Sequence, residues 1–111
     1  MLSAISQRLL SEAFAEGATG TTPKAFKNCG CDETTHYIEW GEGVSSGVVE
    51  IETAPREDYA GTWAPCSTVT FSGTAPKTDY VHVQGTYGAI RHRISTVVTD
   101  GTVSSKIVGA L

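Results

Sequence analysis

The sequence predicts an all-β protein: an antiparallel β-sandwich or jelly roll of about seven strands, preceded by a short N-terminal helix or arm. From residue 24 onward, apolar and polar residues alternate in short runs, which is the period of strands with one face on a core and one in water. Gly, Pro and Asp-Gly turn signals separate these runs at the spacing typical of sandwiches. With 111 residues, the chain is expected to form one domain with a core of its own.

The first 22 residues are expected to form an N-terminal arm and linker, set apart from a sandwich domain over residues 23–111. Residues 1–16 carry an apolar stripe at helical spacing, and a polar connector rich in Gly and Thr follows over residues 17–23. Because a lone helix this short is marginal in water, its stripe must pack on the chain's own sheet or on a neighbouring subunit. The stripe residues proposed for a partner interface are Leu2, Ile5, Leu9 and Phe14.

Strands are expected in seven segments, namely around 25–31, then 35–40, 46–53, 68–72, 79–83, 87–98 and 103–108. Between the fourth and fifth, Gly73 permits a positive φ and Pro76 fixes φ, so the chain turns there. Between the last two, Asp100-Gly101 lies among β-branched residues and is a strong hairpin signal. The last two strands are therefore predicted to form a hairpin.

The alternation also assigns residues to faces of the predicted strands. Phe71 and Ile94 are expected in the core, and His92 shares the apolar face of its strand, which indicates a core or interface histidine. Arg91 and Arg93 occupy the opposite, outward face. A stripe of two arginines suits a salt-bridged contact with an acidic partner, so both join the candidate partner interface, with a solvated face as the alternative.

Composition excludes several classes of protein. The net charge is −4 and the isoelectric point is near 5.2, whereas a protein that binds nucleic acid through phosphate contacts is usually basic. No apolar run approaches the roughly 18 residues needed to span a membrane. No basic leader precedes an apolar segment at the N-terminus, so a secretory signal is not expected. Three cysteines are an odd number, which favours reduced thiols over a disulfide framework.

No metal or cofactor is expected. Cys29 and Cys31 form a single C-x-C pair, and a zinc site would require the fold to add Cys66 and His36. Small, partly buried cysteines in a strand are the simpler interpretation. A group of acidic residues near one strand end lacks the regular Asp, Asn and Gly spacing of a dedicated calcium loop and is interpreted as a solvated surface. Its members are Glu50, Glu52, Glu57 and Asp58.

No catalytic function is predicted, because none of the three histidines has an identifiable Ser or Cys partner in the sequence. A binding function is conceivable at the aromatic residues. Trp63 with Tyr59, or Trp40 with Tyr37, would suit stacking on sugar rings if the tryptophan were exposed. Tyr59 and Trp63 are therefore the candidate ligand platform, although one of the two tryptophans is expected to fill the core.

A series of short motifs follows in a recognisable order between residues 46 and 108. These motifs are V-E-I-E-T-A-P (49–55), G-T-W (61–63), T-V-T-F (68–71), T-D-Y-V (78–81), G-T-Y-G-A-I-R-H-R-I-S (85–95) and D-G-T-V (100–103). The order resembles that of small β-sandwich virion proteins of tailed bacteriophages, which occur as capsid decoration (cement) proteins and as parts of tails and fibres. The motifs belong to the sheet scaffold, and the first 45 residues lie outside the likeness.

This resemblance implies a non-enzymatic virion structural protein, most directly a decoration protein that binds the head lattice as a homodimer or homotrimer. Its partner would be the major capsid protein, and it would be made in the host cytoplasm and reside in the virion, with no nucleic acid or membrane partner. Because a lattice offers many identical sites, a small oligomer gains avidity without large interfaces. A tail or fibre component is the nearest alternative, and a carbohydrate-binding module is the alternative from another class.

Overall fold

The computed structural model describes residues 8–14, 26–27, 33–56, 58–85 and 88–110. Within these ranges the secondary structure is entirely β, without a helix. The eight strands are β1 (Arg8–Phe14), β2 (Phe26–Lys27), β3 (Glu33–Trp40), β4 (Ser46–Ala54), β5 (Ala64–Thr70), β6 (Lys77–Gln84), β7 (Ala89–Thr99) and β8 (Val103–Ala110).

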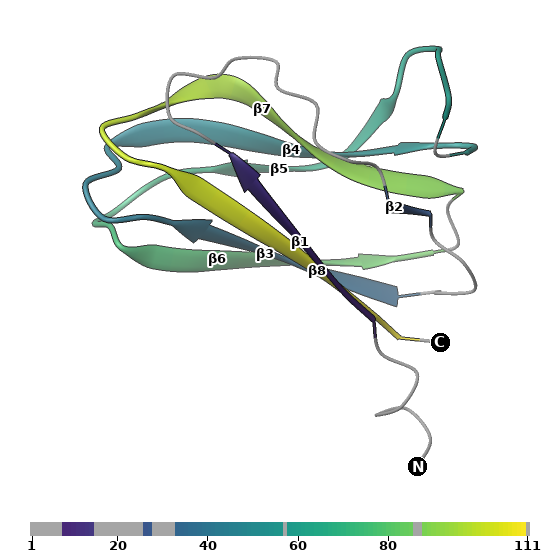
Figure 1. Ribbon diagram of the computed structural model, residues 1–111, viewed down its shortest axis with the longest axis horizontal. Helices are drawn as coiled ribbons and strands as arrows, with labels where there is room; N and C mark the ends of the chain where they lie inside the picture. The colour runs from purple at the N-terminus through teal and green to yellow at the C-terminus, as the bar shows by residue number, and fades with distance from the viewer. Residues whose placement is uncertain (1–7, 15–25, 28–32, 57, 86–87, 111) are drawn as a thin grey trace.

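The strands form two four-stranded sheets that face each other, in the orders β1-β8-β3-β6 and β2-β7-β4-β5 (Figure 1). Every registered pair is antiparallel. The chain changes sheet at each connection except the one from β4 to β5, and this arrangement is an eight-stranded jelly roll. The predicted all-β antiparallel sandwich is confirmed. The described strands number eight and not seven, because β1 forms where a helix was expected.

The predicted N-terminal helix is wrong for Arg8–Phe14, which form β1 and pair with β8 from Arg8↔Gly109 to Phe14↔Val103. The physical reason is tertiary. β8 would otherwise leave one row of backbone N–H and C=O groups unpaired, and an antiparallel ladder satisfies them. The rest of the predicted helix and its connector lie outside the described residues. The division into an arm (1–22) and a sandwich (23–111) remains a prediction.

The predicted hairpin at Asp100-Gly101 is also wrong, because β7 and β8 lie in different sheets. The chain does turn there: Asp100 has a left-handed φ of 68°, and its carboxylate accepts a hydrogen bond from Ser45 Oγ at 2.6 Å. The segment is therefore a corner that carries the chain across the core. Local turn chemistry sets the reversal of direction, whereas packing decides which strand the next segment pairs with.

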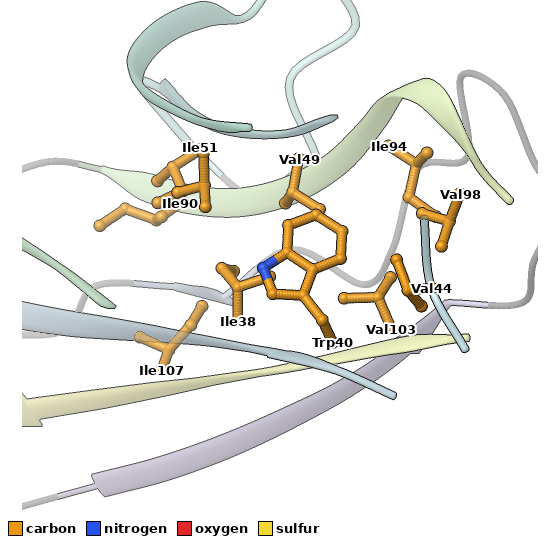
Figure 2. Close-up of a cluster of buried hydrophobic side chains, with 11 residues drawn as sticks. Ile38, Trp40, Val44, Val49, Ile51, Ile90, Ile94, Val98, Val103 and Ile107 are labelled. Atoms are coloured by element: carbon orange, nitrogen blue, oxygen red, sulfur yellow. The ribbon is translucent and has the colours of Figure 1, made fainter. Parts of the chain in front are cut away.

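The core fills the space between the two sheets (Figure 2). Trp40 is 1% exposed, and the partly buried Phe71 packs edge-on against it with ring centroids 5.3 Å apart. The Trp40 indole N–H donates to Asp79 Oδ2 at 2.8 Å, which satisfies its polar atom. The predicted core position of Ile94 is confirmed. The remaining buried members of this cluster are Ile38, Val44, Val49, Ile51, Val69, Ile90, Val98, Val103 and Ile107.

Candidate interaction surface

The two arginines predicted for a partner interface lie on the outer face of the β2-β7-β4-β5 sheet and share one carboxylate. Arg91 Nε donates to Glu52 Oε1 at 2.9 Å, and Arg93 Nε donates to Glu52 Oε2 at 3.0 Å. Glu52 is only 5% exposed, and Arg93 also lies 3.8 Å from Glu50. Two positive and two negative charges therefore compensate one another within the chain, and the stripe is not a free basic surface.

Trp63 covers this cluster. The Arg91 guanidinium carbon lies 4.3 Å from the centre of the Trp63 ring, and the Trp63 indole N–H donates to the carbonyl oxygen of Tyr59 at 3.1 Å. Trp63 also packs with Ala54 and Ala89 in a small second core outside the sandwich. The structure thus brings together Arg91, Trp63 and Tyr59, which the sequence had assigned to two separate candidate sites.

A shallow pocket of about 310 Å³ adjoins the cluster where β4 ends. Gly88 is required there, since a Cβ at this position would lie 1.7 Å from the carbonyl oxygen of Pro55. The lining carries no charged side chain, and its polar groups are hydroxyl groups and backbone. The lining residues are Thr53, Ala54, Pro55, Tyr59, Thr62, Ala64 and Gly88.

The tryptophan platform required for sugar binding is not present among the described residues. Trp40 and Trp63 are 1% and 7% exposed, so neither ring is available for stacking on a sugar. Of the aromatic side chains that the structure describes, the exposed ones are Tyr37 and Tyr80, at 37% and 70%, which face each other across β3 and β6 with centroids 6.4 Å apart. Sequence alternation places both on outward positions, but only the β3–β6 pairing makes them neighbours.

An ion pair and a histidine–carboxylate contact flank the tyrosine pair on this outer face of β8-β3-β6. On one side, Lys106 Nζ donates to Glu39 Oε2 at 2.7 Å, and this bond lowers the pKa of the Glu39 carboxyl. On the other side, His82 Nε2 lies 3.4 Å from Glu33 Oε1. The face therefore combines an exposed aromatic centre with a polar rim, the composition found at protein contact surfaces.

The N-terminal interface candidates are only partly placed. Leu2 and Ile5 lie outside the described residues. Leu9 and Phe14 belong to β1, where their backbone partners are Val108 and Val103. Their role in a partner contact stays a prediction.

The histidine expected in the core is there, together with a second one. His36 and His92 are both 0% exposed, and His36 Nδ1 and His92 Nε2 are hydrogen-bonded at 2.7 Å. His92 Nδ1 also contacts Ser105 Oγ at 2.7 Å, a pairing the sequence did not reveal because the two residues come from different sheets. A serine–histidine pair normally suggests a nucleophile, but Ser105 is 0% exposed and out of reach of a dissolved substrate.

Burial is the largest cause of the pKa shifts of three interior groups, His36, His92 and Cys66. It lowers the pKa of His36 to about 4 and that of His92 to about 3, so both imidazoles are neutral at pH 7. The charge of His82 adds to the effect on His36, and His36 adds to the effect on His92. Burial, followed by the charge of Glu52, raises the pKa of the Cys66 thiol and disfavours its reactive thiolate form.

The metal hypotheses find no support in the part of the chain that the structure describes. No group of three or more His, Cys, Asp and Glu side chains is arranged there to hold a metal ion. Cys29, Cys31 and Glu57 lie outside that part. Glu52 is occupied by two arginines, and Asp58 is paired with Arg56 at 3.0 Å.

Comparisons with known proteins identify the fold. No protein-family model matches the sequence, and no curated protein matches it. Among solved structures, the chain is similar to the SPBc2 prophage-derived protein YomS, with a TM-score of 0.61, 14% identity and 95% of each chain covered. It is similar to a chain of the Triatoma virus empty capsid, with a TM-score of 0.59, 6% identity and coverage of 95% of this chain and 87% of that one.

A third similar structure belongs to Bacillus endospore appendages, described as disulfide-linked pili, with a TM-score of 0.55, 15% identity and coverage of 95% and 87%. These identities are low, so the likeness establishes the jelly-roll fold and not a shared activity. A search of the described residues for a helix long and apolar enough to cross a membrane found none.

Proposed function

We propose that this chain is a non-enzymatic structural protein of a virion, most directly a capsid decoration protein that binds the head lattice as a homo-oligomer. The observation that carries the proposal is the jelly roll, which matches a prophage-derived protein and a viral capsid chain over at least 87% of their lengths. The motif order between residues 46 and 108 points to the same class independently. The burial of Ser105, out of reach of a dissolved substrate although it contacts His92, is consistent with this role.

The tyrosine face, defined by Tyr37 and Tyr80 with the flanking Lys106–Glu39 and His82–Glu33 contacts, is the best-supported contact surface. Tyr80 is 70% exposed on an otherwise polar sheet face, and tyrosines supply contact area at low entropic cost. The N-terminal candidates named above remain part of the proposed interface. Arg91 and Arg93 contribute less than the sequence suggested, because Glu52 already binds both side chains.

The test of the virion role is fractionation of particles from the phage or induced prophage that encodes the chain. An antibody against the purified chain is used on separated heads and tails. Signal in the head fraction supports the decoration role. Signal confined to tails indicates the tail or fibre alternative, and absence from both fractions refutes a virion role.

The contact surface is tested by adding purified variants to heads that lack the protein. Tyr80→Ala should reduce sedimentation with the heads by tenfold or more, because a central exposed aromatic residue dominates a small interface and the lattice multiplies the loss. Thr96→Ala, an exposed position on the other sheet, is the matched control and should bind normally. Equal binding of both variants would rule out the tyrosine face.

A further inference from the structure

Four buried side chains form a continuous polar chain through the core of the sandwich. Thr34 Oγ1 and His36 Nε2 are 2.8 Å apart, and His36 Nδ1 and His92 Nε2 are 2.7 Å apart. His92 Nδ1 and Ser105 Oγ complete the chain at 2.7 Å. Thr34 and His36 lie on β3, His92 on β7 and Ser105 on β8, so His92 bonds twice across the gap between the sheets.

The number of hydrogens shared among these four hydrogen-bonded side chains sets how many protons the two rings can hold. A neutral imidazole has one N–H donor and one acceptor nitrogen, so two neutral rings support all three bonds with every hydrogen pointing the same way along the chain. One extra proton is still compatible, because the outer hydroxyl oxygens of Thr34 and Ser105 can both accept. A second extra proton is not, since His36 Nδ1 and His92 Nε2 would then direct two hydrogens at each other across 2.7 Å.

We propose that the His36–His92 pair is an acid-operated lock between the two sheets. It holds the sheets together while the rings carry at most one extra proton, and it opens when the second proton binds. The rings lie with centroids 4.9 Å apart and no exposure to water, so two positive charges there would have no solvent to screen them.

The charged groups whose side chains the structure describes engage partners on the outer faces of the two sheets, so they do not offset this repulsion. On β6, His82 lowers the pKa of His36 further, and its carboxylate neighbour Glu33 lies on the outer face with it. On β4, Glu50 and Glu52 engage Arg91 and Arg93 on the opposite outer face. The remaining neighbouring strands contribute Glu12 on β1, in register with Ser105, Lys27 on β2, in register with Ala89, Cys66 on β5 and Lys106 on β8.

The direction of the pH effect follows from the same geometry. Both histidines have a lower pKa in the folded chain, about 4 and about 3, than the ordinary value of 6.5 that they regain on unfolding. Their contribution to stability is therefore fully present above pH 6.5 and is lost as pH falls toward 3. Near pH 5, unfolding takes up close to two protons, so the unfolding equilibrium constant should rise about 10³-fold between roughly pH 6 and pH 4 from this pair alone.

The test compares urea unfolding from pH 7 to pH 4 for the natural chain and for His36→Leu with His92→Leu. The double variant should lack the roughly 10³-fold pH-dependent rise, because what remains comes from carboxylates that both proteins share. His82→Gln removes an exposed histidine and should keep most of the rise, and Glu12→Gln tests whether the β1 carboxylate takes part. An unchanged rise in the double variant overturns the proposal.

A second measurement uses the natural chain alone, so the proposal remains testable if the double variant fails to fold. Long-range ¹⁵N–¹H spectra of the imidazoles report each ring's protonation during an acid titration. Both buried rings should remain neutral to about pH 5, and the second of them should become charged only with loss of the folded spectrum. A folded chain with both rings charged would refute the lock, because His36 Nδ1 and His92 Nε2 would then both carry a hydrogen across their 2.7 Å contact.

Discussion

Arg91 holds two parts of the molecule together: its Nε donates to Glu52 at 2.9 Å while its guanidinium carbon lies 4.3 Å from the centre of the Trp63 ring. The first contact joins β7 to β4, and the second fixes the residue that precedes β5. Glu52 is only 5% exposed although it lies on the outer face of the sheet. Losing a buried carboxylate that accepts hydrogen bonds from two arginines costs more stability than losing an exposed one.

Glu52→Gln should lower the free energy of unfolding by about 2–3 kcal/mol. The amide keeps the shape of the side chain but can accept from only one arginine, and its NH₂ group faces the other arginine's donor. Urea unfolding at pH 7 measures the loss. The control is Asp58→Asn, which breaks the exposed pair with Arg56 and should cost no more than about 0.5 kcal/mol. Similar losses for both variants would contradict the account of Glu52.

Ile94→Ala should cost about 2–5 kcal/mol, because Ile94 is fully buried in the core and truncation leaves a cavity. Phe71→Ala should cost less, about 1–3 kcal/mol, since Phe71 is only partly buried beside Trp40. Thr96→Ala, at an exposed position of the same strand as Ile94, should change stability little. Chemical unfolding of the three variants gives the ranking, and a near-zero value for Ile94→Ala would mean that the faces of β7 are inverted.

Asp100→Ala should destabilise the corner between β7 and β8 more than Asp100→Gly does. Both substitutions remove the hydrogen bond from Ser45, but only alanine meets the steric cost of a φ near 68°, about 1 kcal/mol. Thermal unfolding of the two variants measures this difference directly. If both melt at the same temperature, the left-handed conformation at this position carries no cost.

Deleting residues 1–14 should lower stability and promote self-association, because the deletion removes β1 and uncovers the edge of β8. Deleting residues 1–7 leaves β1 in place and should keep the fold. Light scattering and chemical unfolding of both truncations provide the comparison. A discrete oligomer lost in the shorter deletion would assign intersubunit contacts to the first seven residues, as predicted for the arm, whereas a stable monomer after the longer deletion would show that β1 is dispensable.

Alternation in the sequence was a reliable guide to which residues face the core. It placed Ile94 and His92 inside and Arg91 and Arg93 outside, and the structure agrees on all four, whereas Phe71, also expected in the core, is only partly buried. The period-2 pattern works because each of these strands has one wet face, so burial is decided within the strand itself. The pattern failed for Glu52, whose outward position is only 5% exposed and lies between two arginines, one of them stacked on Trp63.

Contacts between distant strands were beyond prediction. The His36–His92 bond joins residues 56 positions apart in the sequence, and the Tyr37–Tyr80 pair depends on the pairing of β3 with β6. The N-terminal segment was misread for the same reason. Its apolar spacing fits a helix locally, while the edge of β8 offers a complete ladder of hydrogen bonds to an extended chain.

The sequence by itself determined the fold class, the positions of most strands and turns, and the inward or outward direction of their side chains, because these follow from local periodicity and turn chemistry. Only the tertiary structure decided which strands pair. At Asp100-Gly101 the local signal predicted a hairpin, yet the chain crosses to the other sheet. Burying the apolar faces of two sheets against each other stabilises the fold more than the hydrogen bonds of one local hairpin do. Packing across the whole molecule therefore decides which strands pair.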